Sequence, residues 1–157
     1  MKKLTYILLC IVLISCSNDS VQEIENSYLF NDNELELIDI INQHRVGINL
    51  PQLQILPHLG YLCSKNNQEM IEAGTLCNCY FIESVNSIDE LYNTQYVSQI
   101  ILYNFSNTQS AMNAIMSDIT SKNIIERNYT DIGIAIQQDT NTNKKYYTVL
   151  IIKRWNT

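Results

Sequence analysis

The stretch from Ser117 to Ala135 constrains the fold most strongly, because it carries the chain from the end of a helix through a polar turn into an apolar strand. In its second half, every other residue from 132 to 136 is isoleucine, the alternation expected of a strand with a buried face. Two further runs, 96–105 and 146–155, are rich in β-branched and aromatic residues and also predict strands. We expect all three to be central strands of one sheet that is buried on both faces.

Four helices are expected around these strands, each bounded by a capping or helix-ending residue. They are a helix from about residue 33 to 47 capped by Asp32 or Asn33, a helix from 58 to 73 stopped by Gly74, a short helix through Leu91 opened by a capping box at 87–90, and a helix capped by Ser106 or Asn107. This mixture of helices and strands predicts an α+β fold with helices on both faces of a small, mainly antiparallel sheet.

Length and charge limit the functional classes. A chain of 157 residues is long enough for one domain with a substantial core and too short for two ordinary domains. The formal net charge is −6, and it becomes −8 if residues 1–15 are removed, because that segment contains two lysines and no acid. So acidic a chain has no electrostatic footprint for nucleic acid, which we exclude as a partner.

The N-terminus has the form of an export signal. Lys2 and Lys3 precede an apolar run at 4–14 that is too short to span a bilayer as a mature helix. The following Leu-Ile-Ser-Cys at 13–16 resembles the bacterial lipobox, in which the cysteine is acylated and becomes the new N-terminus. The alternatives are an ordinary signal peptide in which Cys16 is incidental, or a buried N-terminal helix.

These features predict a domain order and an address. Residues 1–15 are expected to be a lipoprotein signal peptide, 16–32 a flexible tether and 33–157 the folded domain, with a short helix at 21–28 as the alternative for part of the tether. Acylated Cys16 would attach the protein to the lipid bilayer of a bacterial cell envelope, facing the periplasm or the cell exterior.

The stretch at 123–135 resembles a family signature. Asn-Ile-Ile at 123–125 and Asn-Tyr-Thr-Asp-Ile-Gly-Ile-Ala at 128–135 are similar to S-P-G-H-R-x-N-I-L-x-x-x-F-T-E-V-G-V-G of the bacterial CAP (SCP-like) domain. The segments at 40–45, 49–53 and 57–59 resemble the L-I-N-x-x-R, G-L-P-x-L and P-x-L elements that open such domains. The resemblance spans residues 34–155, and it implies a three-layer α-β-α sandwich of CAP type.

The same resemblance implies a degenerate site. The family's cleft histidines and glutamate fall at four positions that hold amides or hydroxyls here: Asn66, Asn78, Gln99, and either Thr120 or Ser121. An amide nitrogen has no lone pair for a metal and a hydroxyl is a weak ligand, so we expect no metal and no cofactor. These four residues should still converge in a polar cleft. It would bind an unknown small molecule, lipid, glycan or protein without catalysis; the alternative is a protease-like or lipid-directed hydrolase that uses the same cleft.

The remaining reactive residues give weaker signals. His44 lies beside Arg45 at a helix end, where a cation favours the helix dipole, and His58 is expected to be solvent-exposed. We expect no zinc site from these two histidines, because no paired ligand motif accompanies either one. Three cysteines, Cys63, Cys77 and Cys79, are expected to be small buried hydrophobic residues. A C-x-C disulfide or a soft-metal pair at 77 and 79 is the alternative.

Acylation of Cys16 is directly testable. We expect the mature protein to begin at Cys16 with a lipid on its sulfur, and to fractionate with membranes. The Cys16→Ala variant should be stalled in processing or released from the membrane, because no acyl chain then holds it. Mass spectrometry of the mature N-terminus makes the test, and a terminus elsewhere or insensitivity of processing to globomycin would rule the prediction out.

Overall fold

The computed structural model describes residues 27–155. Its helices and strands are, in chain order, α2 (Asp32–Gly47), β1 (Gln54–Ile55), α3 (Pro57–Ala73), α4 (Phe81–Leu91), β2 (Thr94–Tyr103), α5 (Thr108–Ser117), α6 (Ile119–Ile125), β3 (Asp131–Gln138) and β4 (Lys145–Arg154). The predicted signal peptide, Cys16 and the first part of the predicted tether lie outside the described residues. Within 27–155, no helix is both long and apolar enough to cross a membrane.

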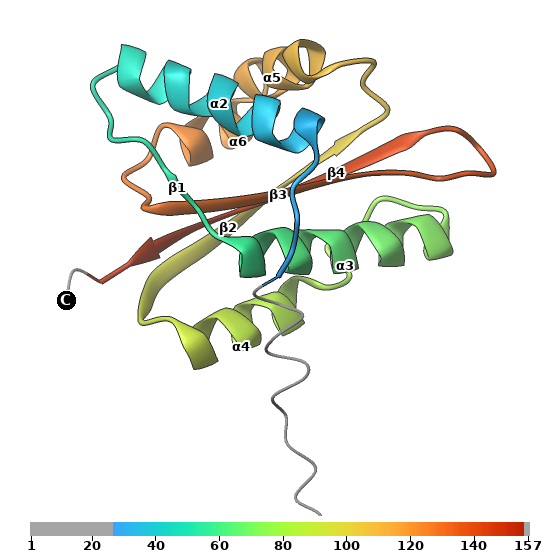
Figure 1. The fold of residues 1–157 in the computed structure, drawn as a ribbon, viewed down its shortest axis with the longest axis horizontal. Coiled ribbons are helices and arrows are strands. Elements are labelled where there is room, and N and C mark those ends of the chain that lie inside the picture. Colours follow the sequence, from blue (N-terminus) through green and yellow to red (C-terminus); the bar gives the residue numbers. More distant parts are fainter. Residues whose placement is uncertain (1–26, 156–157) are drawn as a thin grey trace, which may run out of the picture.

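The strands form one mixed sheet in the order β1-β3-β4-β2. Only the two-residue β1 runs parallel to its neighbour, whereas β3, β4 and β2 pair antiparallel. Helices α2, α5 and α6 cover one face, and α3 and α4 cover the other (Figure 1). The fold is therefore the predicted α+β arrangement, a three-layer α-β-α sandwich around a mainly antiparallel sheet.

The core is split by the sheet into two hydrophobic clusters. The larger cluster packs α2, α5 and α6 against residues such as Ile134 and Val149, and the smaller cluster packs α3 against residues such as Leu150. Strand β4 is buried on both faces, as predicted. The prediction that the 97–103 segment is also central was wrong: β2 pairs only with β4, lies at the sheet edge and is mostly half-buried. Its apolar residues do not reveal that it lacks a second neighbour.

Helix ends follow the sequence signals in part. Asn107 caps α5, and Gly74 ends α3 with a positive φ of 64°, both as predicted. Helix α2 is capped by Asn31 rather than by Asp32 or Asn33. Helix α4 begins at Phe81, so the predicted capping box at 87–90 lies inside a helix that tertiary packing has already started.

The chain joins the domain earlier than the predicted boundary at residue 33. Tyr28 and Phe30 are half-buried, and the Tyr28 hydroxyl donates to Glu34 Oε1 at 3.0 Å. Glu34 is 1% exposed and also accepts from the backbone nitrogens of Asn31 and Ile136, at 2.8 Å each. Burial, followed by the nearby Glu34 charge, raises the pKa of Tyr28. Residues 28–31 thus form part of the folded unit.

Helix α3 approaches β3 so closely that only glycine fits between them. A Cβ atom on Gly133 would overlap the backbone nitrogen of Gly60 and the backbone carbon of Leu59. A Cβ on Gly60 would in turn lie 2.5 Å from the Tyr28 ring. The expectation that another element approaches Gly133 closely is confirmed, and it identifies the α3–β3 contact as the tightest constraint on the lower layer in Figure 1.

The Gly133→Ala variant should therefore be strongly destabilised, by about 3 kcal/mol or more, because backbone must move to admit the methyl group. Gly47→Ala is the matched control, since nothing lies within 4 Å of a Cβ built there. We expect the control to change the free energy of unfolding by less than about 1 kcal/mol, in the stabilising direction. Urea unfolding of both variants followed by circular dichroism makes the comparison, and equal midpoints would contradict the packing argument.

Candidate functional site: a groove at the end of the sheet

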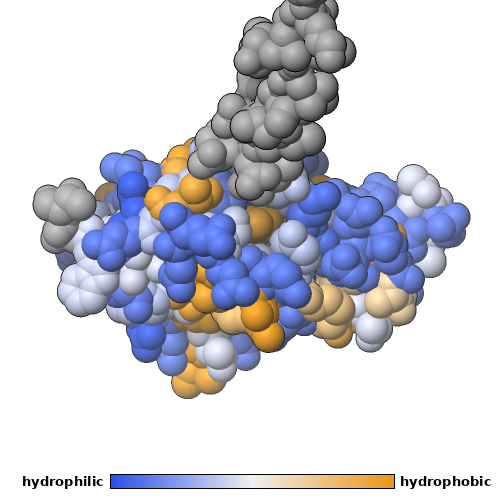
Figure 2. All heavy atoms as spheres, turned by 90° about the horizontal axis from the view of Figure 1, so that it is seen from below, coloured by the Kyte–Doolittle hydropathy of each residue, from blue (hydrophilic) through white to orange (hydrophobic). Residues whose placement is uncertain are grey.

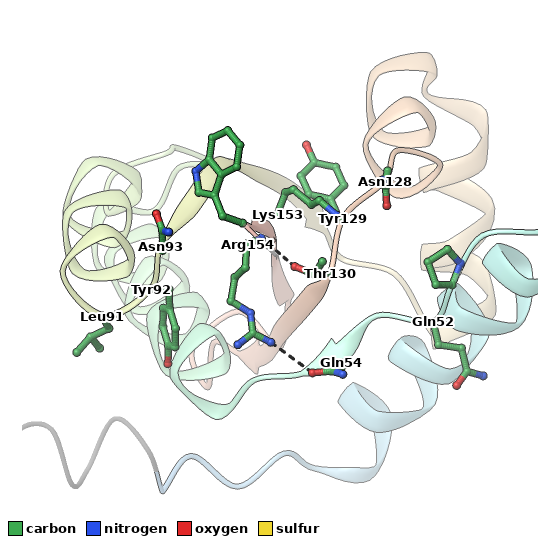
Figure 3. Close-up of a pocket in the computed structure, with 12 residues that line it drawn as sticks. Gln52, Gln54, Leu91, Tyr92, Asn93, Asn128, Tyr129, Thr130, Lys153 and Arg154 are labelled. Atoms are coloured by element: carbon green, nitrogen blue, oxygen red, sulfur yellow. Dashed lines mark hydrogen bonds between the residues drawn. The ribbon is translucent and has the colours of Figure 1, made fainter. Parts of the chain in front are cut away.

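A groove of about 750 Å³ lies at the end of the sheet where β4 finishes and β2 begins (Figure 3). Four segments line it: residues 51–54, residues 91–93 after α4, the turn at 128–130, and residues 153–155. These segments come from both helical layers, so the groove wraps around the sheet end instead of lying on one face. A volume of this size is in the range of small-molecule binding sites.

Arg154 is held rigidly in the groove wall. Its Nε donates to Asp131 Oδ2 at 2.8 Å and its Nη2 to Asp131 Oδ1 at 2.6 Å, a bidentate ion pair with a fully buried carboxylate. Nη2 also donates to Gln54 Oε1 at 3.3 Å (Figure 3). The Arg154 backbone nitrogen donates to Thr130 Oγ1 at 3.0 Å. The guanidinium charge is therefore neutralised and its direction fixed.

The rim of the groove combines an aromatic ring with amides. Trp155 is 55% exposed, and its backbone nitrogen donates to Asn93 O at 2.9 Å, which fastens the end of β4 to the start of β2. Asn93, Gln52 and Asn128 are exposed on the other lining segments. Each amide side chain offers two hydrogen-bond donors and an acceptor, so the rim can recognise polar groups from several sides.

A buried cation connects two walls of the groove. Arg45, which is 0% exposed, donates to Pro51 O at 3.0 Å on one wall and to Arg127 O at 2.8 Å and Tyr129 O at 3.3 Å on the other. A fourth bond, to Ile125 O at 2.6 Å, fixes the end of α6. Burial lowers the pKa of Arg45.

Asn66, one of the predicted cleft residues, is a buried framework residue. Its Nδ2 donates to Thr148 Oγ1 at 3.1 Å and to Cys77 O at 3.4 Å, and its Oδ1 accepts from Tyr80 N at 3.0 Å. Thr148 in turn donates to Asn67 Oδ1 at 2.7 Å. This network ties α3 to β4 and to the loop before α4, and it leaves little of the Asn66 amide for a ligand.

The other four predicted cleft residues are dispersed. Gln99 lies opposite Leu150, on the same sheet face as Asn66, and both polar atoms of its side chain are buried without a hydrogen-bond partner. Asn78 is exposed in the α3–α4 loop. Thr120 and Ser121 lie on α6, in the opposite helical layer (Figure 1). None of the five lines the sheet-end groove or the smaller groove beside Gln68 and Gln137.

The histidines are engaged by the framework. His44 Nε2 lies 2.9 Å from Glu126 Oε1, which links the end of α2 to the end of α6. The prediction that His58 is solvent-exposed was wrong: it is 0% exposed, with Nε2 3.0 Å from Ser87 Oγ and its ring against Tyr92. Helix α4 covers it, which no local pattern around Pro57 reveals. Burial lowers the pKa of His58, which favours the neutral ring.

The cysteines divide into two kinds. Cys63 is buried as predicted, its Sγ donates to Gly133 O at 3.3 Å, and burial raises its pKa well above the usual value. Cys77 and Cys79 form a disulfide in the α3–α4 loop, so the prediction that they are buried hydrophobic residues was wrong. Within residues 27–155, no group of three or more His, Cys, Asp or Glu side chains is arranged to hold a metal ion.

The class of the protein follows from its sequence profile together with this fold. Residues 38–152 match the cysteine-rich secretory protein (CAP) family, and the match covers well over half of the chain. The protein therefore belongs to the CAP family, as the signature at 123–135 predicted. No match to this chain is found among curated protein sequences.

Three solved structures share the fold at low identity. An outer surface protein of Borrelia burgdorferi has a TM-score of 0.70 and 18% identity, over 81% of this chain and 97% of that one. A cysteine-rich secretory protein from Staphylococcus aureus has a TM-score of 0.67 and 16% identity, over 78% of this chain and 38% of that one. An extracellular SCP-domain protein from Bacillus anthracis has a TM-score of 0.68 and 16% identity, over 88% of this chain and 44% of that one. This chain thus spans less than half the length of the last two proteins.

Two of the predicted cleft residues, Asn66 and Asn78, allow a matched comparison of a buried structural role with an exposed surface position. Asn66→Ala removes three hydrogen bonds from a buried network and should lower the free energy of unfolding by about 2 to 4 kcal/mol. Asn78→Ala changes an exposed side chain and should cost less than about 0.5 kcal/mol. Thermal unfolding of the two variants measures the difference, and a stable Asn66→Ala protein would mean that Asn66 has a role other than the framework one.

Proposed function

We propose that this CAP-domain protein is an extracytoplasmic lipoprotein, anchored through acylated Cys16, that binds a ligand non-catalytically in the sheet-end groove. The groove itself is the observation that carries the proposal: about 750 Å³ of open space, an exposed tryptophan, exposed amides and a guanidinium that is fixed before any ligand arrives. Preorganised polar groups of this kind reduce the ordering cost of binding.

The proposed address rests on the N-terminal pattern and on the similar structures. Two of them are described as an outer surface protein and an extracellular protein. The face seen in Figure 2 is mainly hydrophilic, with hydrophobic residues in separate small areas. Attachment to a bilayer is accordingly assigned to the acyl chains at Cys16 and not to insertion of this face.

A hydrolase is the second candidate, and one contact favours it. His58 Nε2 and Ser87 Oγ are 3.0 Å apart, the spacing of a base and a nucleophile. However, the His58 ring is completely buried, Ser87 is only partly exposed, and neither residue lines one of the two grooves. We therefore interpret the pair as a link between these two helices, and we rank non-catalytic binding first.

Native mass spectrometry of the full-length protein purified from membranes tests the proposed site. A ligand that co-purifies should be lost or at least about tenfold depleted in Trp155→Ala and Asn128→Ala, because both remove exposed contacts from the rim. Ile119→Ala is the control, since Ile119 is a 74% exposed apolar residue on α6 that does not line the groove. Equal occupancy in all four proteins would overturn the proposed site.

A further inference from the structure

Lys153 lines the groove, and most of its side chain is covered by the protein. It is 9% exposed, and it faces Tyr96 of β2 across the strand register. Among the described residues, no carboxylate lies within ion-pair distance of its ammonium group, and no hydrogen bond from that group is present. The ammonium group of Lys153 is therefore a positive charge that the described part of the domain leaves without a counter-charge in the groove.

Arg154 leaves a second set of donors open beside it. Nε and Nη2 are occupied by Asp131 and Gln54, whereas Nη1 makes no hydrogen bond within the described part of the chain. Arg154 carries no net charge to the groove, because Asp131 neutralises it. The groove therefore presents one uncompensated positive charge, from Lys153. It also presents one hydrogen-bond donor held in a fixed position, Arg154 Nη1, which belongs to a neutral ion pair.

The arrangement of these two groups sets the size of the ligand. Successive residues of a strand point to opposite faces, so the Lys153 and Arg154 side chains leave β4 on opposite sides of the sheet. Both nevertheless line one groove, which bends around the strand end. A single small anion cannot contact both groups, whereas a ligand with several linked polar groups can follow the bend.

The rim indicates the rest of the ligand's chemistry. Trp155 offers an exposed ring face, and the amides of Gln52, Asn93 and Asn128 are exposed at separate points around it. A sugar ring matches this set, because its C–H face packs on an aromatic ring while neighbouring hydroxyls both donate to and accept from amides. An apolar ligand would leave these amides unpaired at a cost.

We propose that the sheet-end groove binds a carboxylate-bearing saccharide of two or more rings, whose carboxylate pairs with Lys153 and whose hydroxyls meet Arg154 Nη1 and the rim amides. The inference rests on the proposed function, since it names the ligand class of that same groove. The inference goes beyond the proposed function because it assigns the preference for acidic over neutral sugars to one residue, Lys153.

Trp155 provides the readout, because it is the only tryptophan in the sequence and lies in the groove. Trigalacturonate is titrated into the detergent-solubilised full-length protein while tryptophan emission is recorded, with galactotriose as the uncharged analogue. We expect saturable binding of the acidic sugar at least about tenfold tighter than that of the neutral sugar, the worth of one charge-assisted hydrogen bond.

Lys153→Met is the decisive variant, since it keeps an unbranched apolar side chain of similar length and removes the charge. It should weaken trigalacturonate binding about 10- to 100-fold and leave galactotriose binding unchanged. Lys145→Met is the control, because Lys145 lies at the opposite end of the same strand. Unfolding midpoints of both variants verify that they are folded.

Several outcomes would overturn the inference. They are equal affinity for acidic and neutral sugars, trigalacturonate binding that Lys153→Met does not weaken, and competition by inorganic phosphate or by hexaglutamate at the same concentrations as the sugar. Failure of both saccharides to bind would also overturn the inference. In each case the proposed function is judged separately: it stands if the co-purified ligand is lost from the Trp155→Ala protein, and it falls if that ligand is retained.

Discussion

The buried guanidinium of Arg45 is the interaction on which the groove depends. Its side chain is 0% exposed and forms no ion pair with a carboxylate of residues 27–155. There, hydrogen bonds to the carbonyl oxygens of Pro51, Ile125, Arg127 and Tyr129 compensate the charge. Because those carbonyls belong to the loop after α2 and to the segment between α6 and β3, one side chain fixes both walls of the groove. Lysine could not replace it, since a single ammonium group cannot point along four separate directions.

The layer formed by α3 and α4 is held on the sheet by a different set of interactions. Gly133 lets α3 lie directly on β3, and the Asn66, Asn67 and Thr148 side chains then satisfy one another and nearby backbone groups within the contact. Close approach and a closed polar network support each other, because the hydrogen bonds form only when the helix is this near. Asn66, which the sequence analysis expected to line a cleft, is thereby part of the framework that holds α3 on the sheet.

Much of the architecture could be predicted from the sequence, because it is encoded in local patterns. Alternating isoleucines identified β3, and Gly74 and Asn107 identified helix ends. Contacts between distant segments were not encoded in this way. Nothing near Pro57 shows that α4 will cover His58, and nothing in the 96–105 run shows that it pairs on one side only.

The groove escaped prediction for the same reason. Its lining residues come from four segments separated by up to about a hundred positions, and no spacing rule connects Pro51 to Trp155. One signal was available: a lone tryptophan directly after a strand, preceded by two cations, is an unusual way to end a buried β-element. The predicted cleft residues do not mark the groove, because the structure distributes them over α3, the loop after it, β2 and α6.

The charge of the groove is opposite to that of the molecule around it. With a formal net charge of −6, the protein repels an acidic ligand at long range, while Lys153 attracts it once contact is made. Salt then acts in two directions, because it screens the distant repulsion that slows encounter and weakens the short-range pairing only where water reaches it. Water reaches the Lys153 ammonium group in the groove, so salt also screens its pairing with a ligand. Added salt should therefore raise the association rate, because it screens the repulsion, and also raise the dissociation rate, because it screens the short-range pair.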